Sequence, residues 1–251
     1  MVHIILQGIH GKMGTVLQTM IGARSDCCIV AGIDAQNVPC DGIPVFSSLA
    51  ECTVQADVLI DFSNASATDA TLDTCVQKQL PCVICTTGLS ENTLVHLEAA
   101  AQKVAVFKSA NMSLGINVLI ALAKKANAML GLDYEIEIIE KHHHNKLDAP
   151  SGTALMIADA IQEAAPVPYH YVYDRHNERK KRDANEIGLH AVRGGSIVGE
   201  HEVLFCGPDE VITLSHSAAS REVFANGAVS AALFLSGKPA GLYSMEDVIQ
   251  V

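Results

Sequence analysis

The sequence predicts an α/β protein in two parts: a doubly wound parallel sheet with helices on both faces, then an α+β part with a mixed or antiparallel sheet. Three observations predict it. Over the first 110 residues, short β-branched apolar runs alternate with helical stretches, a glycine-rich loop follows the first run, and later strands alternate apolar with polar residues. A chain of 251 residues is long enough for one large domain or two modest ones.

The first part contains continuous apolar runs, which are typical of parallel strands that are buried on both faces. Ser90 and Glu91 supply a cap and a first-turn acid to the third helix expected between these runs. The predicted strands are 2–7, 28–34, 43–46, 58–62, 81–86 and 104–108, and the predicted helices are 12–24, 65–79 and 90–103.

The pattern changes after residue 112. Polar and apolar residues now alternate along the strands, which predicts a sheet with one wet face. The charged segment 174–186 is predicted to be a mobile loop, and the three strands after it are predicted to form an antiparallel meander. In order, the predicted elements are a helix over 113–130, a strand over 133–143, a helix over 150–165, strands near 187–193, 198–206 and 210–217, and a helix over 220–236.

The composition disfavours several classes of protein. The 17 Lys and Arg against 28 Asp and Glu give a formal net charge of −11, whereas nucleic-acid and anionic-membrane binders need a basic face. No apolar run approaches the roughly 18–20 residues that span a bilayer, and the first residues do not resemble a signal peptide. The eight cysteines lie mostly in apolar runs, and Cys82 and Cys85 share one predicted strand, which favours reduced structural thiols in a cytoplasmic protein.

The glycine-rich loop GIHGKMG, residues 8–14, joins the first predicted strand to the first helix. Glycines let the backbone approach a pyrophosphate, and Asp34, at the end of the next strand, is placed to accept hydrogen bonds from ribose hydroxyls. This order predicts a Rossmann domain that binds a dinucleotide; a tight turn in another α/β fold is the alternative. We expect NADH to be usable, because Asp34 repels a 2′-phosphate and Ala35 offers no cation, while Lys12 leaves NADPH open.

Three consecutive histidines, 142–144, are the most unusual feature of the second part. A metal site would need a third ligand, and none is evident, so no metal is expected. A proton-transfer site fits better, because histidine exchanges protons near neutral pH and Lys146 supplies a nearby cation. A structural role is the third possibility.

Three polar segments lie where the predicted fold is expected to bind ligands. Residues 151–153 start a predicted helix, whose first N–H groups attract a carboxylate. Asn111 and residues 86–88 follow predicted strands, at the edge where open α/β sheets bind ligands. Ordinary turn chemistry is the alternative for these last two.

The pattern E-x-H-H-x-x-K-x-D-x-P-S-G-T-A over 140–154 resembles the signature of the 4-hydroxy-tetrahydrodipicolinate reductase family, also called the dihydrodipicolinate reductase family. Further motifs of that family follow in order and span nearly the whole chain. They are GIHGKMG at 8–14, DFS at 61–63, TTG at 86–88, SANMSLGIN at 109–117, VRGGSIVGEH at 192–201 and FANGA at 224–228.

The resemblance implies an NAD(P)H-dependent oxidoreductase of the diaminopimelate route to lysine. It would reduce 4-hydroxy-tetrahydrodipicolinate, by way of dihydrodipicolinate, to tetrahydrodipicolinate. The resemblance also implies a dinucleotide-binding domain over 1–112, to which the tail 237–251 returns. A substrate-binding domain over 113–236 would assemble a homotetramer through its sheet.

The resemblance assigns a role to each motif position. His142 would donate and accept a proton, and Lys146 would be a second donor. The residues that would hold the substrate are His143, Ser151, Gly152 and Thr153. The residues that would line the cofactor are Gly8, Ile9, His10, Gly11, Lys12, Met13, Asp34, Cys85, Thr86, Thr87, Ser109, Ala110, Asn111 and Met112.

Three positions depart from the family pattern. Cys85 stands where many members have glycine, Met112 where many have phenylalanine, and Ala35 where some have arginine. The last departure weakens the case for a strong NADPH preference. Another Rossmann oxidoreductase, such as an aspartate or homoserine dehydrogenase, and a non-catalytic nucleotide sensor remain as alternatives.

Overall fold

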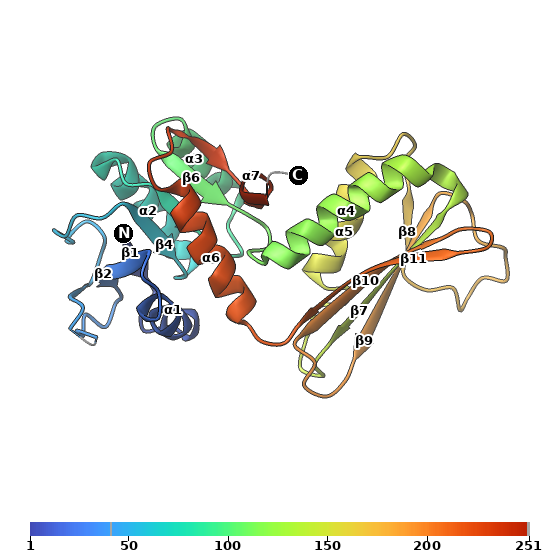
Figure 1. Ribbon diagram of the computed structural model, residues 1–251, viewed down its shortest axis with the longest axis horizontal. Helices are drawn as coiled ribbons and strands as arrows, with labels where there is room; N and C mark the ends of the chain where they lie inside the picture. The colour runs from blue at the N-terminus through green and yellow to red at the C-terminus, as the bar shows by residue number, and fades with distance from the viewer. Residues whose placement is uncertain (41, 250–251) are drawn as a thin grey trace. The chain divides into compact units, whose positions relative to one another are not determined.

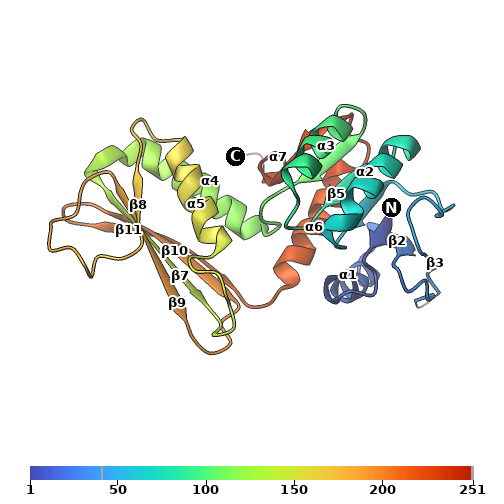
Figure 2. The same cartoon turned by 180° about the vertical axis from the view of Figure 1, so that it is seen from behind.

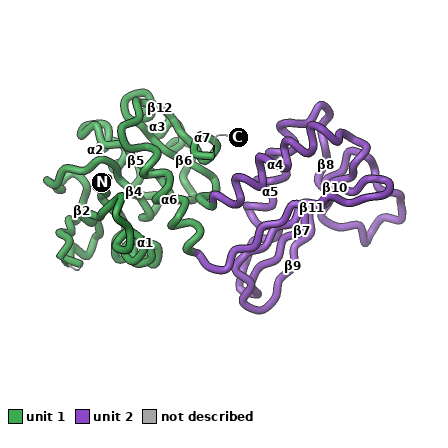
Figure 3. The backbone as a smooth tube through the Cα atoms, in the orientation of Figure 1, with its two compact units in different colours: residues 1–113, 222–250 green, residues 114–221, 251 purple. Residues whose placement is uncertain are grey.

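The structure, a computed structural model, describes residues 1–40 and 42–249, and it divides into two compact units (Figure 3). Unit 1 comprises Met1–Ser113 and Glu222–Gln250, and unit 2 comprises Leu114–Arg221. The chain therefore leaves unit 1, builds unit 2 from one continuous segment, and returns.

Unit 1 is built on a seven-stranded sheet in which every described pairing is parallel. The strand order is β12-β6-β5-β4-β1-β2-β3. The connections reverse direction at β1, which is the doubly wound arrangement that the sequence predicts. The strands are β1 (Val2–Gln7), β2 (Cys27–Ile33), β3 (Val45–Phe46), β4 (Val58–Asp61), β5 (Cys82–Ile84), β6 (Ala105–Lys108) and β12 (Gly241–Tyr243).

Helices cover both faces of this sheet (Figures 1 and 2). α2 and α3 pack against one another on one face, where Leu72 and Leu97 join Ile5, Leu59 and Ile84 in one buried cluster. α1 and α6 pack against one another on the opposite face. The bounds are α1 (Lys12–Gly22), α2 (Ala65–Lys78), α3 (Glu91–Ala101), α6 (Glu222–Leu235) and α7 (Met245–Ile249).

The position of α6 corrects the predicted domain boundary. The helix was expected to close the substrate domain at residue 236, but it belongs to unit 1, and unit 2 ends at Arg221. Small buried residues let α6 lie close to β4, β5, β6 and α1: a Cβ on Gly227 would stand 1.6 Å from the Met112 carbonyl oxygen. The face of α6 therefore completes the covering of the parallel sheet.

Unit 2 contains a five-stranded mixed sheet with helices packed against it. The strand order is β11-β10-β7-β9-β8. Ile136 and Ile138 of β7 lie in a core with Leu119 and Ile120 of α4 and Ile157 of α5. The elements are α4 (Leu114–Leu130), the 3-10 helix η1 (Gly131–Asp133), β7 (Glu135–His142), α5 (Gly152–Glu163), β8 (His170–Val172), β9 (Glu186–Arg193), β10 (Gly199–Cys206) and β11 (Val211–Ala218).

The predicted antiparallel meander is only partly present. β10 and β11 are antiparallel as expected, but β7 lies between β9 and β10, parallel to β9 and antiparallel to β10. The alternating pattern of β7 explains this, because its buried Ile136 and Ile138 are then flanked by Ile187 and Leu189 of β9 and by Val203 and Phe205 of β10. The tight turn between β9 and β10 therefore joins strands that straddle a third.

The helical segment Leu114–Asp133 has the length and mean hydropathy of a membrane span, although Lys124 and Lys125 interrupt its apolar residues. Among the described residues, this is the one helix that is long and apolar enough to cross a membrane, judged by length and composition alone. Its apolar residues Ile116, Leu119 and Ile120 are buried against α5 and β11 within unit 2. The core helix of a soluble protein meets the same length and composition criteria.

Candidate functional site

The glycine loop joins β1 to α1 as predicted, and its conformation depends on glycine. Gly8 has a φ of +79°, and a Cβ there would lie 2.7 Å from the Phe62 carbonyl oxygen. A Cβ on Gly14 would lie 2.3 Å from the Gly8 carbonyl oxygen. Gly11 is the N-cap of α1 and provides no capping side chain, so the first N–H groups of the helix stay available to an anion.

The remaining residues of the loop differ in exposure. The Ile9 side chain is buried, so its backbone is the part that can face a ligand, whereas Lys12 is exposed. The Lys12 ammonium makes no hydrogen bond or ion pair with the described residues. The His10 ring contacts the Val38 carbonyl oxygen at 2.9 Å, and Met13 is half-buried.

Asp34 follows β2 and links two backbone segments. Its carboxylate accepts hydrogen bonds from the His10 N–H and the Gln36 N–H, both at 3.2 Å. It also lines a hollow of about 250 Å³, together with Gly8, Ala35 and Asn64, among others. This hollow lies where β2 and β4 flank β1, the point at which a doubly wound sheet binds its ligand.

The ends of β5 and β6 are held together by Asp61, Thr86 and Lys108, of which sequence reasoning singled out only Thr86 as a site residue. The Thr86 hydroxyl donates to the fully buried Asp61 carboxylate at 2.8 Å, and the Lys108 ammonium donates to the Thr86 carbonyl at 2.8 Å. Burial lowers the pKa of Lys108 and raises that of the Cys85 thiol. Cys85, which replaces a family glycine, is itself buried, while Thr87 is exposed. Asp61 could have been identified from the DFS motif at 61–63, whereas no sequence motif pointed to Lys108.

The segment 109–112 follows β6 at the same edge. The Ser109 hydroxyl donates to the Asn111 carbonyl oxygen, and the Asn111 side-chain oxygen accepts from the Ser113 N–H at 2.8 Å. Met112 is buried beside α6, whereas Ala110 is exposed. Because β1, β5 and β6 are parallel, the three predicted cofactor segments after them lie at one edge of the sheet.

In unit 2, His142 ends β7 in a charged network centred on Glu140. The His142 Nδ1 lies 2.6 Å from Glu140 Oε2, and Arg193 donates two bonds of 2.7 Å to the two carboxylate oxygens. The Ser151 N–H donates a further bond of 2.9 Å. Burial alone would raise the pKa of Glu140, but Arg193, His142 and Ser151 outweigh burial and lower it. Glu140 therefore stays ionised although it is fully buried.

The geometry leaves the other nitrogen of His142 for proton transfer. With a carboxylate as its acceptor, Nδ1 carries a proton, so Nε2 is the atom that can exchange one. Gly199 makes room at this atom, since a Cβ there would lie 3.1 Å from Nε2. The His201 ring packs edge-on against the His142 ring at 5.2 Å, and its Nε2 lies 3.0 Å from the Ser151 hydroxyl. Burial, aided by His142, lowers the pKa of His201 to about 4.

Lys146 and the start of α5 follow along the chain. The Lys146 ammonium lies 2.9 Å from an Asp148 carboxylate oxygen and thereby lowers the pKa of Asp148. Ser151 caps α5 by accepting a hydrogen bond from the Ala154 N–H at 3.1 Å. The predicted proton donor and the predicted carboxylate receptor therefore share the Glu140 network, because Ser151 both bonds to Glu140 and begins the helix of Gly152 and Thr153.

His143 and His144 line a hollow of about 390 Å³ on unit 2, with Asn145, Gly195, Ser196, Val198 and Arg221. The His144 N–H and ring Nδ1 lie 3.2 and 2.9 Å from the Gly195 carbonyl oxygen. His142 and His144 are thus hydrogen-bonded to different groups, His142 to Glu140 and His144 to Gly195.

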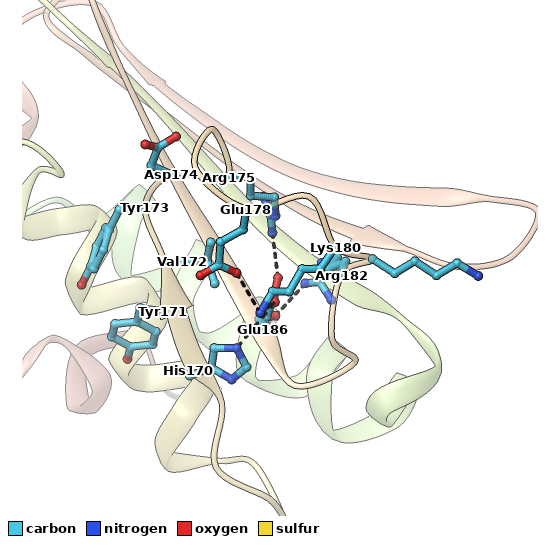
Figure 4. Close-up of a pocket in the computed structure, with 11 residues that line it drawn as sticks. His170, Tyr171, Val172, Tyr173, Asp174, Arg175, Glu178, Lys180, Arg182 and Glu186 are labelled. Atoms are coloured by element: carbon cyan, nitrogen blue, oxygen red, sulfur yellow. Dashed lines mark hydrogen bonds and ion pairs between the residues drawn. The ribbon is translucent and has the colours of Figure 1, made fainter.

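The charged segment 174–186 surrounds a separate cavity of about 460 Å³ (Figure 4). Among the described residues, His170, Asp183 and Glu186 form the one cluster of potential metal ligands. The Lys180 ammonium already lies 3.3 Å from Asp183 and 4.0 Å from Glu186. Arg175 and Arg182 both bind Glu137 of β7. These ion pairs fasten the predicted mobile loop to its own sheet.

Comparisons with known proteins agree on one family. The family model for the N-terminus of dihydrodipicolinate reductase matches residues 2–112, and the model for its C-terminus matches residues 115–249. A 4-hydroxy-tetrahydrodipicolinate reductase of Caldanaerobacter subterraneus subsp. tengcongensis is 52% identical over 100% of this chain and 99% of its own length. One of Clostridium tetani is 46% identical over 99% of this chain and 97% of its own. Among solved structures, a dipicolinate-bound dihydrodipicolinate reductase from Paenisporosarcina sp. TG-14 has a TM-score of 0.83 at 26% identity, with 99% of each chain covered.

Proposed function

This chain belongs to the dihydrodipicolinate reductase family, and from that premise we propose that it reduces 4-hydroxy-tetrahydrodipicolinate to tetrahydrodipicolinate with a pyridine nucleotide. The reaction is a step of the diaminopimelate route to lysine. The observation that carries the proposal is the buried Glu140–His142 pair, with a bond of 2.6 Å, at the end of β7. It supplies a proton-transferring group whose tautomer is set by a carboxylate, which a nucleotide sensor would not need.

The edge of unit 1 fits a pyridine nucleotide. Gly8 and Gly14 allow the close backbone approach, the start of α1 offers N–H groups to a pyrophosphate, and Asp34 lines the adjoining hollow. When bound in reduced form, the nucleotide supplies the hydride for ring carbon C4 of the substrate. Residues 85–87 and 109–112 would hold its nicotinamide end, since they follow β5 and β6 at the same edge.

His142 would donate the proton that completes the reduction. Loss of the substrate's 4-hydroxyl leaves a conjugated ring, and hydride addition at C4 requires protonation of the adjacent carbon. Nε2 of His142 is the donor, because Nδ1 is bound to Glu140. Glu140 is a positioning residue in this scheme: it fixes the orientation and the tautomer of the His142 ring, as Arg193 fixes Glu140.

Lys146 and the first turn of α5 would bind and polarise the substrate. Lys146 would assist proton delivery through its positive charge, and it would exchange its ion pair with the exposed Asp148 for one with the substrate. The N–H groups of Gly152 and Thr153, with the His143 ring, would orient one carboxylate.

We further propose that NADH serves as the hydride donor. Asp34 and Ala35 line the hollow at the expected ribose site, and neither offers a cation to a 2′-phosphate. Lys12 is the basic side chain of the loop that would let NADPH be used as well. The Asp34→Ala variant should therefore lose more NADH affinity than NADPH affinity, and equal losses in a fluorescence titration would contradict the ribose contact.

Self-association through the exposed face of the unit 2 sheet also follows as a proposal. This face, opposite α4 and α5, carries partly exposed Ile139 and Leu204 and exposed Val192, beside the Lys141 ion pairs. A homotetramer would cover it. Sedimentation analysis of the wild type and of Ile139→Lys tests this, because a charge at a buried interface should dissociate the assembly.

The deciding experiment is a coupled assay. A synthase generates the substrate from pyruvate and aspartate semialdehyde, and the oxidation of NADH or NADPH is then followed by absorbance. Turnover that depends on the synthase product supports the proposal. Turnover of aspartate or homoserine instead would assign the chain to another oxidoreductase, and nucleotide binding without turnover would make it a sensor.

A further inference from the structure

The Asp148 carboxylate faces two groups that the proposed function assigns to the substrate. Its Oδ1 lies 2.9 Å from the Lys146 ammonium, which is the main reason why the pKa of Asp148 is lowered. The N–H of Gly152, at the start of α5, lowers that pKa further. A carboxylate of the protein itself therefore faces a cation and a helix N–H group, the donors that would receive a carboxylate of the substrate.

Asp148 is not needed to begin α5. Ser151 is the N-cap, and its hydroxyl accepts a hydrogen bond from the Ala154 N–H at 3.1 Å. The Ser151 N–H in turn donates to Glu140 at 2.9 Å. One capping side chain is the usual requirement of a helix start. The position of Asp148 at the first turn therefore has an explanation other than capping.

The backbone of Asp148 is fixed, whereas its side chain can turn. Arg193 donates a bond of 2.6 Å to the Asp148 carbonyl oxygen and binds both carboxylate oxygens of the buried Glu140. The Asp148 side chain is 57% exposed, against 21% for that of Lys146. A change of side-chain rotamer would move the carboxylate towards solvent while the chain that links β7 to α5 stays in place. The contact with Lys146 can therefore be broken without unfolding this segment.

A second carboxylate at these donors meets the charge of Asp148. Two carboxylates that share one site repel one another, and each disfavours the ionised form of its neighbour. A substrate that reaches Lys146 must therefore displace Asp148 or bind beside its negative charge. In either case part of the binding free energy is used against Asp148, so the substrate binds more weakly than it would to the same donors without this carboxylate.

We propose that Asp148 occupies the donors of Lys146 and Gly152 in the ligand-free protein, leaves them when a dicarboxylate binds, and thereby lowers the affinity for substrate and product alike. The inference rests on the proposed function, which places a substrate carboxylate at these donors. Asp148 is then an affinity-setting residue that touches no reacting atom. Because substrate and product are both dicarboxylates, the same contact favours product release, and it weakens binding without raising the barrier of the chemical step.

The test is a calorimetric titration of pyridine-2,6-dicarboxylate into the full chain with oxidised nucleotide bound. The variants are Asp148→Asn, which keeps the shape of the side chain, and Asp148→Ala, which removes it. Asp209→Asn is the control, because it removes one negative charge from an exposed turn of the same unit. Circular dichroism and nucleotide affinity check that each variant is folded, and the coupled assay gives KM and kcat.

We expect both Asp148 variants to bind the dicarboxylate about 2- to 5-fold more tightly and to lower KM by a similar factor, with kcat near the wild-type value. Asp209→Asn should leave all three quantities unchanged. Unchanged or weaker binding of the dicarboxylate by Asp148→Asn would overturn the inference, and weaker binding would make Asp148 a positioning residue for Lys146.

A crystal structure of the wild-type complex tests the displacement directly. The Asp148 carboxylate should have turned away from Lys146 when the dicarboxylate is bound, and a carboxylate still paired with Lys146 would contradict the proposal. A wild type that binds pyridine-2,6-dicarboxylate but has no reductase turnover would instead overturn the proposed function, so the two failures are distinguishable.

Discussion

The candidate sites of the two units are formed by different parts of the chain: backbone groups in unit 1 and side chains in unit 2. In unit 1 the site is mostly backbone: glycines at 8, 11 and 14, an uncapped helix start, and loop carbonyls held by Lys108. In unit 2 it is a network of ionisable side chains around the buried Glu140. A backbone site fails when a Cβ is added, whereas a side-chain network fails when a charge or proton is removed.

This difference follows from what each site has to do. A pyrophosphate needs close approach and N–H dipoles, which backbone supplies without titrating. Proton transfer needs a group with two protonation states near neutral pH, and buried charged partners to control them. Adding a Cβ at the glycine loop should therefore impair only the site of unit 1. Removing a charge or a proton-transferring group should impair only the site of unit 2.

The largest expected effect is on turnover. His142→Gln removes the proton donor and should lower kcat by roughly 10²–10⁴-fold, while NADH affinity stays near the wild-type value because the nucleotide cradle lies in unit 1. Steady-state kinetics and a fluorescence titration measure the two quantities. His176→Gln, in the exposed charged segment, is the matched control. Near-normal turnover in His142→Gln would remove this residue from the mechanism.

The next effect tests the backbone site. Gly14→Ala places a Cβ 2.3 Å from the Gly8 carbonyl oxygen and 2.4 Å from that of Ile9. We expect a loss of stability at the upper end of roughly 1–3 kcal/mol, together with weaker NADH binding and unchanged dicarboxylate binding. Gly22→Ala is the control on the same helix, because its Cβ would meet nothing within 4 Å. Urea unfolding and titration with both ligands distinguish the variants, and equal losses would contradict the close-approach argument.

The smallest expected effect is a loss of folding stability at acidic pH. The folded-state pKa of His201 is about 4, lowered by burial and by His142, whereas an unfolded histidine has a value of about 6.5. Between these values the unfolded chain binds a proton that the folded chain does not, so stability falls as the pH drops from about 6.5 towards 4. From pH 7 to 5 this group should cost about 2 kcal/mol.

His201→Gln should reduce the pH dependence by that amount. Denaturant unfolding at pH 7 and pH 5 gives the comparison, and His3→Gln, at an exposed position near the start of β1, serves as the control because it leaves the unit 2 network intact. If His201→Gln keeps the full pH dependence, the neutral buried histidine is not its source. A change confined to unit 2 would support the distinction between the two sites.

Much of unit 1 could be predicted because its signals are local. Continuous apolar runs predicted β1, β2 and β4 to β6 within a few residues, and the glycine loop lies where the motif indicated. β8 and β12 were not predicted, because neither lies in a continuous apolar run of the kind that predicted β5, which is equally short. The pairing of β7 between β9 and β10 depends on which apolar columns meet in the core, and no local sequence pattern contains that information.

The side-chain network of unit 2 shows the same limit. The histidine cluster was evident, but Glu140 and Arg193 are separated by 53 residues and Ser151 and His201 by 50. Such pairs become visible only when the strands are in register. The motifs 140–154 and 192–201 contain all four residues, so the sequence holds them without showing that they touch.

The insertion of unit 2 into unit 1 has a consequence for the order in which the chain folds. Residues 114–221 are continuous, so unit 2 can complete its core as soon as that segment leaves the ribosome. Unit 1 lacks α6 and β12 until residues 222–243 are made, and until then α1 covers only part of the sheet face that α6 will complete. During synthesis, the nucleotide cradle should therefore mature last although its glycine loop is made first.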